Sequence, residues 1–315
     1  MDLIYQRKWE ETGISVNSYV HQLKNYRYNW HEDEYELNVV LTGSAEFVRG
    51  NDYFTLEGGD MILINPGVGH ASYSLMDKTA ALVIHIPQEA FKPLLEQGQS
   101  YRFMYVTDYK SRNTSTARKL RYYATALLLA LAKPDRLNIF RSRALVDLIA
   151  ALLVDEVPRT IIPYHKEDEL HRQAIRIMTS YMQEHFSEKI TLDDLASLTR
   201  YNRTYISTLF KETLGIRFYD YLIRLRITHA LYSLKDDSLT LTDVALDNGF
   251  PDLKNFNRKF REFMHISPSQ YRAVIRSDPH GFLINQRRFY QPEDPLVSPI
   301  LRSYLDIFEQ GKDGL

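Results

Sequence analysis

Two segments of the chain repeat one helical pattern, and this repeat constrains the fold more than any other feature of the sequence. The first, ITLDDLASLTRYNRTYISTLFKETLG, covers residues 190–215, and the second, LTLTDVALDNGFPDLKNFNRKFREFMHISP, covers residues 239–268. In both, a threonine caps a short helix, a small alanine lies on its inner face, and a polar turn leads to a second helix. Phe210 and Phe260 stand near the ends of the two second helices, 50 residues apart. A small residue lets two helices cross closely, so the pattern predicts two helix-turn-helix units.

The second segment also carries a longer signature at fixed spacing. Its positions are Ala245, Gly249, Phe250, Phe256, Arg258, Phe260 and the closing Ser267, Pro268, Ser269, Gln270, Tyr271 and Arg272. In these residues the chain resembles the AraC/XylS family of transcription regulators, with a match over about residues 170–272. The resemblance implies an all-α domain in which a helix at about residues 218–235 connects two helix-turn-helix units. It also implies that two recognition helices enter successive major grooves on one face of double-stranded DNA.

The two recognition helices carry outward side chains suited to DNA, because polar side chains on a helix in the major groove reach base edges. The predicted base contacts are Arg203, Thr204, Ser207, Thr208, Leu253, Lys254, Asn257 and Arg258. Asn257 and Arg258 are the strongest readers, since they pair bidentately with adenine and guanine. The alternative for Arg258 is a salt bridge or a phosphate contact. The predicted phosphate contacts are Lys211, Lys259 and Arg261.

The N-terminal part of the sequence is patterned as strands. Residues 15–87 contain short runs rich in Val, Ile, Tyr, Phe and Thr, separated by turn signals such as Thr42-Gly43 and Pro66-Gly67. This spacing is typical of an antiparallel sandwich or small barrel. Residues 29–87 also resemble a cupin barrel. The corresponding positions are Asn29, His31, Glu36 and Gly43 in one cupin motif and Gly59, Asn65, Pro66, Gly67 and His70 in the other. Two of them depart from the motifs: Asn29 stands where a histidine is usual, and Asn65 stands where a proline is usual.

Polar side chains gather in the predicted barrel. The predicted ligand-binding residues are Arg27, Asn29, His31, Glu36, Asn38 and His70. The favoured effector is a carbohydrate, by family analogy and because the chain is rich in tyrosine, with 22. One alternative is a structural polar cluster. Another is a metal site of His31, Glu36 and His70, since two histidines and a carboxylate suit iron or manganese. Because Asn29 stands where the cupin motif has a histidine, we predict no metal and no cofactor, and we interpret His85 as a wall residue.

Between the strands and the repeat, apolar residues recur at helical spacing over 114–132 and 137–156. This helical hairpin covers the barrel, forms a subunit interface, or does both. The predicted fold class is α+β: a cupin-like antiparallel β-barrel plus helical hairpin, then an all-α domain. The predicted parts are a ligand-sensing domain at 1–110, a dimerisation hairpin at 111–157, a linker at 158–168, a DNA-binding domain at 169–275 and a C-terminal extension without an assigned role at 276–315.

Composition excludes several other classes of protein. The 39 Lys and Arg against 40 Asp and Glu leave a net charge of −1, so the case for DNA binding rests on pattern rather than on charge. The chain has no cysteine, which excludes disulfides, thiolate catalysis and cysteine-ligated zinc. No apolar run is long enough to span a bilayer, and the first residues lack a secretory signal pattern. We therefore expect no membrane partner and a cytoplasmic location.

The predicted function is a ligand-responsive transcription regulator that is not an enzyme. The expected partners are operator DNA, a small-molecule effector, a second copy of the chain and RNA polymerase, with activation and repression both open. One alternative is a metal-dependent cupin enzyme fused to a DNA-binding domain. The other is a ligand-independent regulator whose barrel serves only for dimerisation.

Overall fold

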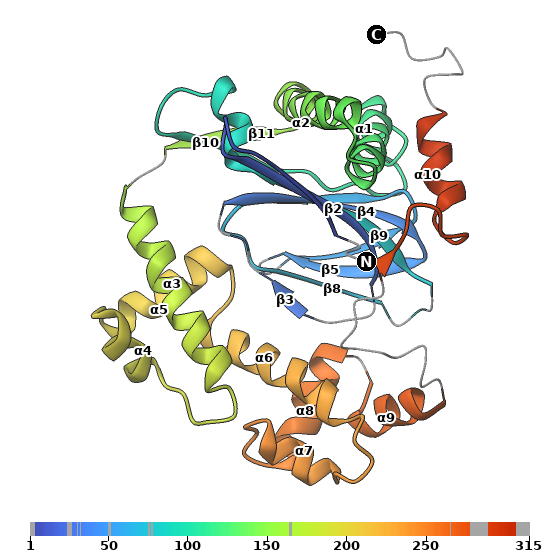
Figure 1. Cartoon of the computed structure of the whole chain (residues 1–315). Coiled ribbons are helices and arrows are strands. Elements are labelled where there is room, and N and C mark those ends of the chain that lie inside the picture. Colours follow the sequence, from blue (N-terminus) through green and yellow to red (C-terminus); the bar gives the residue numbers. More distant parts are fainter. Residues whose placement is uncertain are drawn as a thin grey trace.

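The computed structural model combines a β-rich N-terminal part with a helical C-terminal part, which confirms the predicted α+β class (Figure 1). It describes residues 4–23, 27–29, 31, 33–49, 52–74, 76, 78–163, 166–264, 266–277 and 289–306. The N-terminal elements are β1 (Tyr5–Trp9), β2 (Ile14–Gln22), β3 (Arg27–Asn29), β4 (Glu34–Thr42), β5 (Ser44–Arg49), β6 (Asp52–Glu57), β7 (Met61–Ile64), β8 (His70–Tyr73), β9 (Ala80–Pro87), the 3-10 helix η1 (Gln88–Leu94) and β10 (Gln99–Phe103).

The later elements are mostly helices. They are α1 (Ser115–Ala132), α2 (Arg136–Glu156), β11 (Arg159–Pro163), α3 (Lys166–Glu184), α4 (Leu192–Thr199), α5 (Arg203–Leu214), α6 (Phe218–Ser233), α7 (Leu241–Asp247), α8 (Leu253–Met264), α9 (Pro268–Ser277), β12 (Phe289–Tyr290) and α10 (Ser298–Leu305). Within the part of the chain that the structure describes, no helix has the length and apolar character needed to cross a membrane.

Two antiparallel sheets formed by β1 to β9 make up what we call the β domain. The first sheet has the order β1-β2-β9-β4-β7, and the second has the order β3-β8-β5-β6. The antiparallel strands predicted for residues 15–87 are thus present. An apolar cluster that includes Phe47, Leu56 and Ile62 draws side chains from both sheets and holds them face to face.

The first sheet is the middle layer of three. On the face away from the second sheet, Leu37 and Leu82 belong to one core cluster with Leu120 and Leu127 of α1. Figure 1 shows α1 and α2 lying across this face. Because the middle sheet is buried on both faces, every residue of β9 is buried. Such a strand reads as a continuous apolar run and does not alternate between polar and apolar residues.

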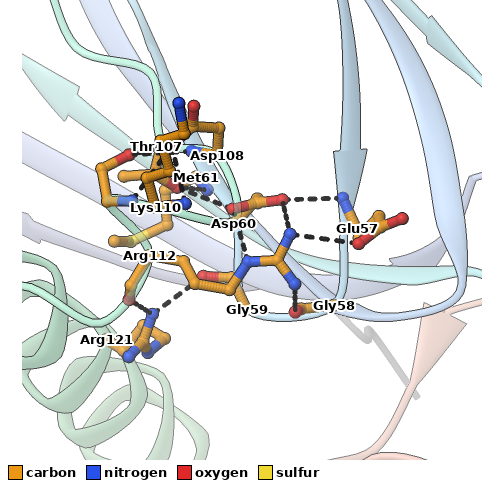
Figure 2. Close-up of polar contacts among 11 residues, drawn as sticks. Glu57, Gly58, Gly59, Asp60, Met61, Thr107, Asp108, Lys110, Arg112 and Arg121 are labelled. Atoms are coloured by element: carbon orange, nitrogen blue, oxygen red, sulfur yellow. Dashed lines mark hydrogen bonds and ion pairs between the residues drawn. The ribbon is translucent and has the colours of Figure 1, made fainter.

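The two helices predicted for the hairpin are present as α1 and α2, with Thr114 and Asp135 as their N-caps. The start of α1 is fixed to the β domain through Asp60, in the turn before β7 (Figure 2). Arg112 donates to Asp60 from Nε at 3.1 Å and from Nη2 at 2.8 Å, and the Thr107 hydroxyl donates at 3.2 Å. Asp60 is buried, and a buried carboxylate is tolerated only with such partners. The ion pair therefore ties the hairpin to the sheet.

The stretch predicted as a linker contains a strand. Residues 159–163 form β11, which pairs antiparallel with β10. The β-branched residues Thr160, Ile161 and Ile162 suit an extended conformation. The two prolines of this stretch suggested a break in structure, but local composition does not reveal a pairing partner about 60 residues earlier in the chain.

The helical part contains the repeat that the sequence predicts. Thr191 caps α4 and Thr240 caps α7, each in a capping box with an aspartate three residues on. One apolar cluster surrounds Phe210 in the first unit, and another surrounds Phe260 in the second. Helix α6 contributes to both clusters, so it joins the two helix-turn-helix units as the resemblance implies.

The second sheet of the β domain packs directly on the helical part. Val48 of β5 and Ala71 of β8 are buried in the same cluster as Ile223 and Ile227 of α6. Figure 1 shows α6 beside β3 and β8. The connecting helix therefore contacts the β domain as well as both helix-turn-helix units.

The C-terminal extension returns to the β domain. Strand β12 pairs antiparallel with β2, which adds a strand to the first sheet. Tyr290, Val297 and Leu301 are buried in the core beneath α1, and α10 packs against α1. The short helix predicted near residues 299–309 is present as α10, while residues 307–315 lie outside the described part of the chain.

Candidate functional site

Three histidines surround one carboxylate between the two sheets. Glu36 on β4 and His85 on β9 are register partners in the first sheet, and His70 opens β8 in the second. The Glu36 Oε2 atom lies 2.7 Å from His31 Nε2, 3.1 Å from His70 Nε2 and 3.6 Å from His85 Nε2. Asn38 donates to the other oxygen of Glu36 at 2.7 Å. Both sheets thus supply donors to one buried centre.

This centre is shielded from solvent on most sides. Glu36, His70 and His85 are buried, while the His31 side chain remains 27% exposed. Burial raises the pKa of Glu36, but the charge of His70 and the hydrogen bonds from His31 and His70 outweigh that effect. The pKa of this carboxyl therefore lies well below its usual range, and Glu36 is an ionised, acceptor-only group.

A further set of contacts holds the histidines. The Glu34 carboxylate lies 3.1 Å from His85 Nδ1, and this hydrogen bond lowers the pKa of Glu34. His70 Nδ1 lies 3.2 Å from the carbonyl of Val68, and the Tyr19 hydroxyl lies 3.4 Å from His85 Nε2. Such contacts fix the orientation of each ring.

The structure brings together most of the residues predicted for the pocket. His31, Glu36, Asn38 and His70 meet at the centre. Asn29 lies on β3 opposite His70, and Arg27 lies on the same strand, but its side chain is outside the described part.

The sequence predicts His85 as a wall residue, and it did not reveal that His85 lies beside Glu36. The signal was available in strand alternation: His85 and Glu36 face inward as direct neighbours once β9 is paired with β4. That pairing joins strands almost 50 residues apart and is not visible in local sequence. The structure therefore shows His85 as a buried wall residue with hydrogen-bond partners, and it adds that His85 Nε2 lies 3.6 Å from Glu36 Oε2.

The first recognition helix, α5, presents the side chains predicted for it. Arg203, Thr204, Ser207 and Thr208 are exposed, and so is Lys211. Ile206, Leu209 and Phe210 are buried on the opposite face. Asn202 caps this helix by accepting from the Tyr205 amide at 2.9 Å. The helix therefore offers one polar face, and its N-terminal end lies at the surface.

The second recognition helix, α8, has a more strongly basic face. Lys254, Arg258 and Arg261 are exposed and Asn257 is half-buried. A surface hollow is lined by Leu241, Leu253, Lys254, Asn257, Arg258, Arg261, Glu262, Ser267 and Ser269. Leu253 differs from the predicted outward side chain, because it is partly buried and packs against the core of the second unit.

Two basic residues of α8 are held by the same carboxylate. Arg258 Nη1 donates to Glu262 Oε1 at 3.0 Å, and Lys259 Nζ donates to Glu262 Oε2 at 2.7 Å. The Arg258 pair is exposed and contributes about 0.3–0.5 kcal/mol, whereas the Lys259 side chain is partly buried. Arg258 can therefore exchange Glu262 for a stronger partner at low cost.

Comparison with known proteins finds a matching family for the β-rich part of the chain and another for the helical part. A model described as an AraC-like ligand-binding domain matches residues 13–130, and one described as a helix-turn-helix domain matches residues 195–273. The chain therefore combines an AraC-like ligand-binding domain with a helix-turn-helix domain. Its ligand-binding match covers β2 to β9 with the central cluster, and its helix-turn-helix match covers α5 to α8 with both recognition helices.

Curated relatives of this chain are named as transcriptional regulators. An HTH-type transcriptional regulator of Staphylococcus aureus (strain COL) is 27% identical over 239 residues, covering 75% of this chain and 31% of the relative. The chain thus spans about a third of the length of such Staphylococcus relatives. The HTH-type transcriptional regulator YisR of Bacillus subtilis (strain 168) is 23% identical over 259 residues, covering 76% of this chain and 86% of YisR.

Solved structures include similar chains at low overall similarity. ToxT from Vibrio cholerae is 14% identical with a TM-score of 0.42, covering 82% of this chain and 97% of that one. A protein from Listeria innocua is 34% identical with a TM-score of 0.31, covering 32% of this chain and 95% of that one.

Proposed function

We propose that this chain is an AraC-family regulator that binds specific operator DNA through α5 and α8, and that it responds to a small polar effector, a carbohydrate, held in the β domain. The observation that carries the proposal is the pair of recognition helices, each with an exposed polar face and a buried apolar one. A helix of this kind fits the major groove. The chain acts in the cytoplasm, where it meets the chromosome and RNA polymerase, and it has no catalytic role.

The effector response requires that the effector favour one arrangement of the domains over another. Strand β8 supports such a coupling, because one of its faces points into the β domain and the other packs on helix α6. His70 points to Glu36 in the centre, while the next residue, Ala71, is buried against Ile227 of α6. A ligand that moves β8 by displacing the His70–Glu36 contact would therefore shift the packing of the connecting helix.

The proposal for base readout centres on Arg258. Replacing Arg258 with alanine is expected to weaken binding to the cognate operator by about 1–3 kcal/mol and to relax sequence preference at one position. Binding to random DNA should change little, because phosphate contacts from Lys211 and Arg261 persist. Titration of labelled operator and random duplexes at one salt concentration measures both effects.

The matched control for this substitution is Arg276→Ala. Arg276 is also an exposed arginine of the helical part, but it lies on α9 and pairs with Asp237 at 2.8 Å. The control variant should keep wild-type operator affinity. Equal loss on operator and random DNA for Arg258→Ala would show that Arg258 contacts only phosphate.

We further propose that α2 forms the homodimer interface. Leu137, Phe140 and Leu148 are 56%, 75% and 45% exposed, and their spacing places them along one side of the helix. Replacing Phe140 with glutamate should raise the dimer dissociation constant about tenfold or more, since losing a central aromatic contact costs about 2 kcal/mol. Sedimentation equilibrium measures this constant. Tyr53→Glu, which changes an aromatic residue 65% exposed on β6, should leave it unaltered, and a monomeric wild-type chain would refute the interface.

A further inference from the structure

The cluster around Glu36 has the composition of a metal site. His31, Glu36 and His85 each place one possible ligand atom within 4.8 Å of the other two. His70 Nε2 lies 3.1 Å from the same Glu36 oxygen. We propose that His31, Glu36 and His85 bind one divalent first-row transition-metal ion between the two sheets, with His85 as a ligand from outside the two cupin motifs. The proposal does not depend on DNA binding.

The spacing of the donor atoms fits a single ion. Imidazole nitrogens and carboxylate oxygens lie about 2.0–2.2 Å from bound zinc, so two ligands of one ion are about 3.0–3.5 Å apart. His31 Nε2 and His85 Nε2 lie 2.7 and 3.6 Å from Glu36 Oε2, and these distances bracket this range. Because the three ligand atoms all lie within 4.8 Å of one another, small side-chain rotations suffice to bring them to bonding distance of one ion.

His70 holds the Glu36 carboxylate from the second sheet. Its Nδ1 lies 3.2 Å from the Val68 carbonyl, and its Nε2 lies 3.1 Å from Glu36 Oε2. A hydrogen bond of this kind orients a ligating carboxylate without binding the ion itself.

Glu34 orients the ring of His85. Its Nδ1 faces the carboxylate of Glu34 at 3.1 Å, which leaves Nε2 without a hydrogen in the neutral ring. The Tyr19 hydroxyl, 3.4 Å from Nε2, can donate to that atom while no metal is bound. A histidine that binds a metal through one ring nitrogen usually donates a hydrogen bond from the other nitrogen to a carboxylate or carbonyl. One divalent cation at the centre would be bound by the Nε2 atoms of His31 and His85 together with one oxygen of Glu36.

The donor set selects the kind of metal. Imidazole and carboxylate ligands without any thiolate suit zinc, iron, nickel, cobalt or manganese in the divalent state. The chain has no cysteine, so softer sulfur ligation is excluded. Asn38, which donates to the second oxygen of Glu36 at 2.7 Å, leaves Oε2 as the ligating atom. The 27% exposed side chain of His31 marks the side open to solvent.

Cobalt is the probe that tests this proposal, because Co²⁺ bound by histidine and carboxylate absorbs visible light. The full-length chain is stripped with a chelator, dialysed and titrated with Co²⁺, and metal content is also measured by elemental analysis. The expected result is a visible spectrum that saturates at one ion per chain and is displaced by Zn²⁺. His85→Gln and Glu36→Gln should each weaken Co²⁺ binding by about tenfold or more, since each removes one ligand.

A matched control is His185→Gln. His185 also pairs with a glutamate, at 2.9 Å from Glu188, but it lies just beyond the end of α3, far from the cluster in sequence. This variant should bind Co²⁺ like the wild type. A wild-type chain that binds no ion above the level of the His85→Gln variant would overturn the proposal and leave a hydrogen-bonded polar cluster. Measuring the wild type directly keeps the test decisive even if a variant misfolds, and operator titration of the same sample tests the regulator function separately.

Discussion

Replacing Gly249 with alanine is expected to destabilise the helical part by about 2–5 kcal/mol and to weaken operator binding with it. Gly249 has φ +77°, a conformation that costs residues with a Cβ atom about 1–2 kcal/mol. The new Cβ would also lie 2.8 Å from Arg226 Nε, 2.8 Å from the Ser187 carbonyl and 2.9 Å from the Phe186 carbonyl. Overpacking of this kind adds about 1–3 kcal/mol.

The residues that an added Cβ at Gly249 would contact explain why operator affinity should fall. The buried Arg226 guanidinium of α6 donates to the Phe186 carbonyl at 2.8 Å and to the Glu188 carbonyl at 2.7 Å. These bonds tie the loop before the first helix-turn-helix unit to the connecting helix, beside the turn that precedes the second recognition helix. An alanine at this point therefore disturbs the spacing of both units at once.

Thermal unfolding followed by circular dichroism, with operator titration on the same sample, measures the effect of Gly249→Ala. Gly98→Ala is the matched control, because Gly98 also has a positive φ of +79° but no atom within 4 Å of an added Cβ. The control should show only the smaller conformational cost. If the two variants lose the same stability, the close approach of Arg226 does not constrain Gly249.

Deleting residues 278–315 is expected to reduce the stability of the β domain by about 4.5–9 kcal/mol. Tyr290, Val297 and Leu301 are at most 3% exposed, and burying each such side chain contributes about 1.5–3 kcal/mol. The truncation also removes the ring of Tyr304, which lies 5.2 Å from the Arg121 guanidinium, and it exposes apolar surface on α1.

Denaturant unfolding of the truncated and full-length chains measures this loss. A shorter truncation after Asp306 keeps every side chain named above and should leave the unfolding midpoint unchanged. A deletion of residues 278–315 that leaves the β domain equally stable would contradict a structural role for β12 and α10.

The helical part could be predicted from the sequence in unusual detail, because its determinants are local. The N-cap threonines Thr191 and Thr240, the Ser267-Pro268 start of α9 and the apolar faces of α5 and α8 depend on residues within one or two helical turns. Leu253 is the exception, since helical spacing near the first turn of α8 did not separate an outward position from a partly buried one.

The β domain was less predictable, because its contacts join distant segments. The pairing of β9 with β4 brings His85 to Glu36, and the pairing of β11 with β10 turns a proline-containing linker into a strand. The return of β12 to β2 crosses more than 260 residues of chain. Register between such strands depends on which faces are buried, and local patterns do not contain that information.

Selection of bound sequences from a random DNA pool by the full-length chain tests the central claim most directly. The regulator proposed here should enrich one motif with two conserved boxes about 10 base pairs apart, since two recognition helices on one face of the duplex are separated by one helical turn. Hydroxyl-radical footprinting of the enriched duplex should show protection on that face. A chain that enriches no motif, or that binds selected and random duplexes with equal affinity at the same salt concentration, would contradict the account.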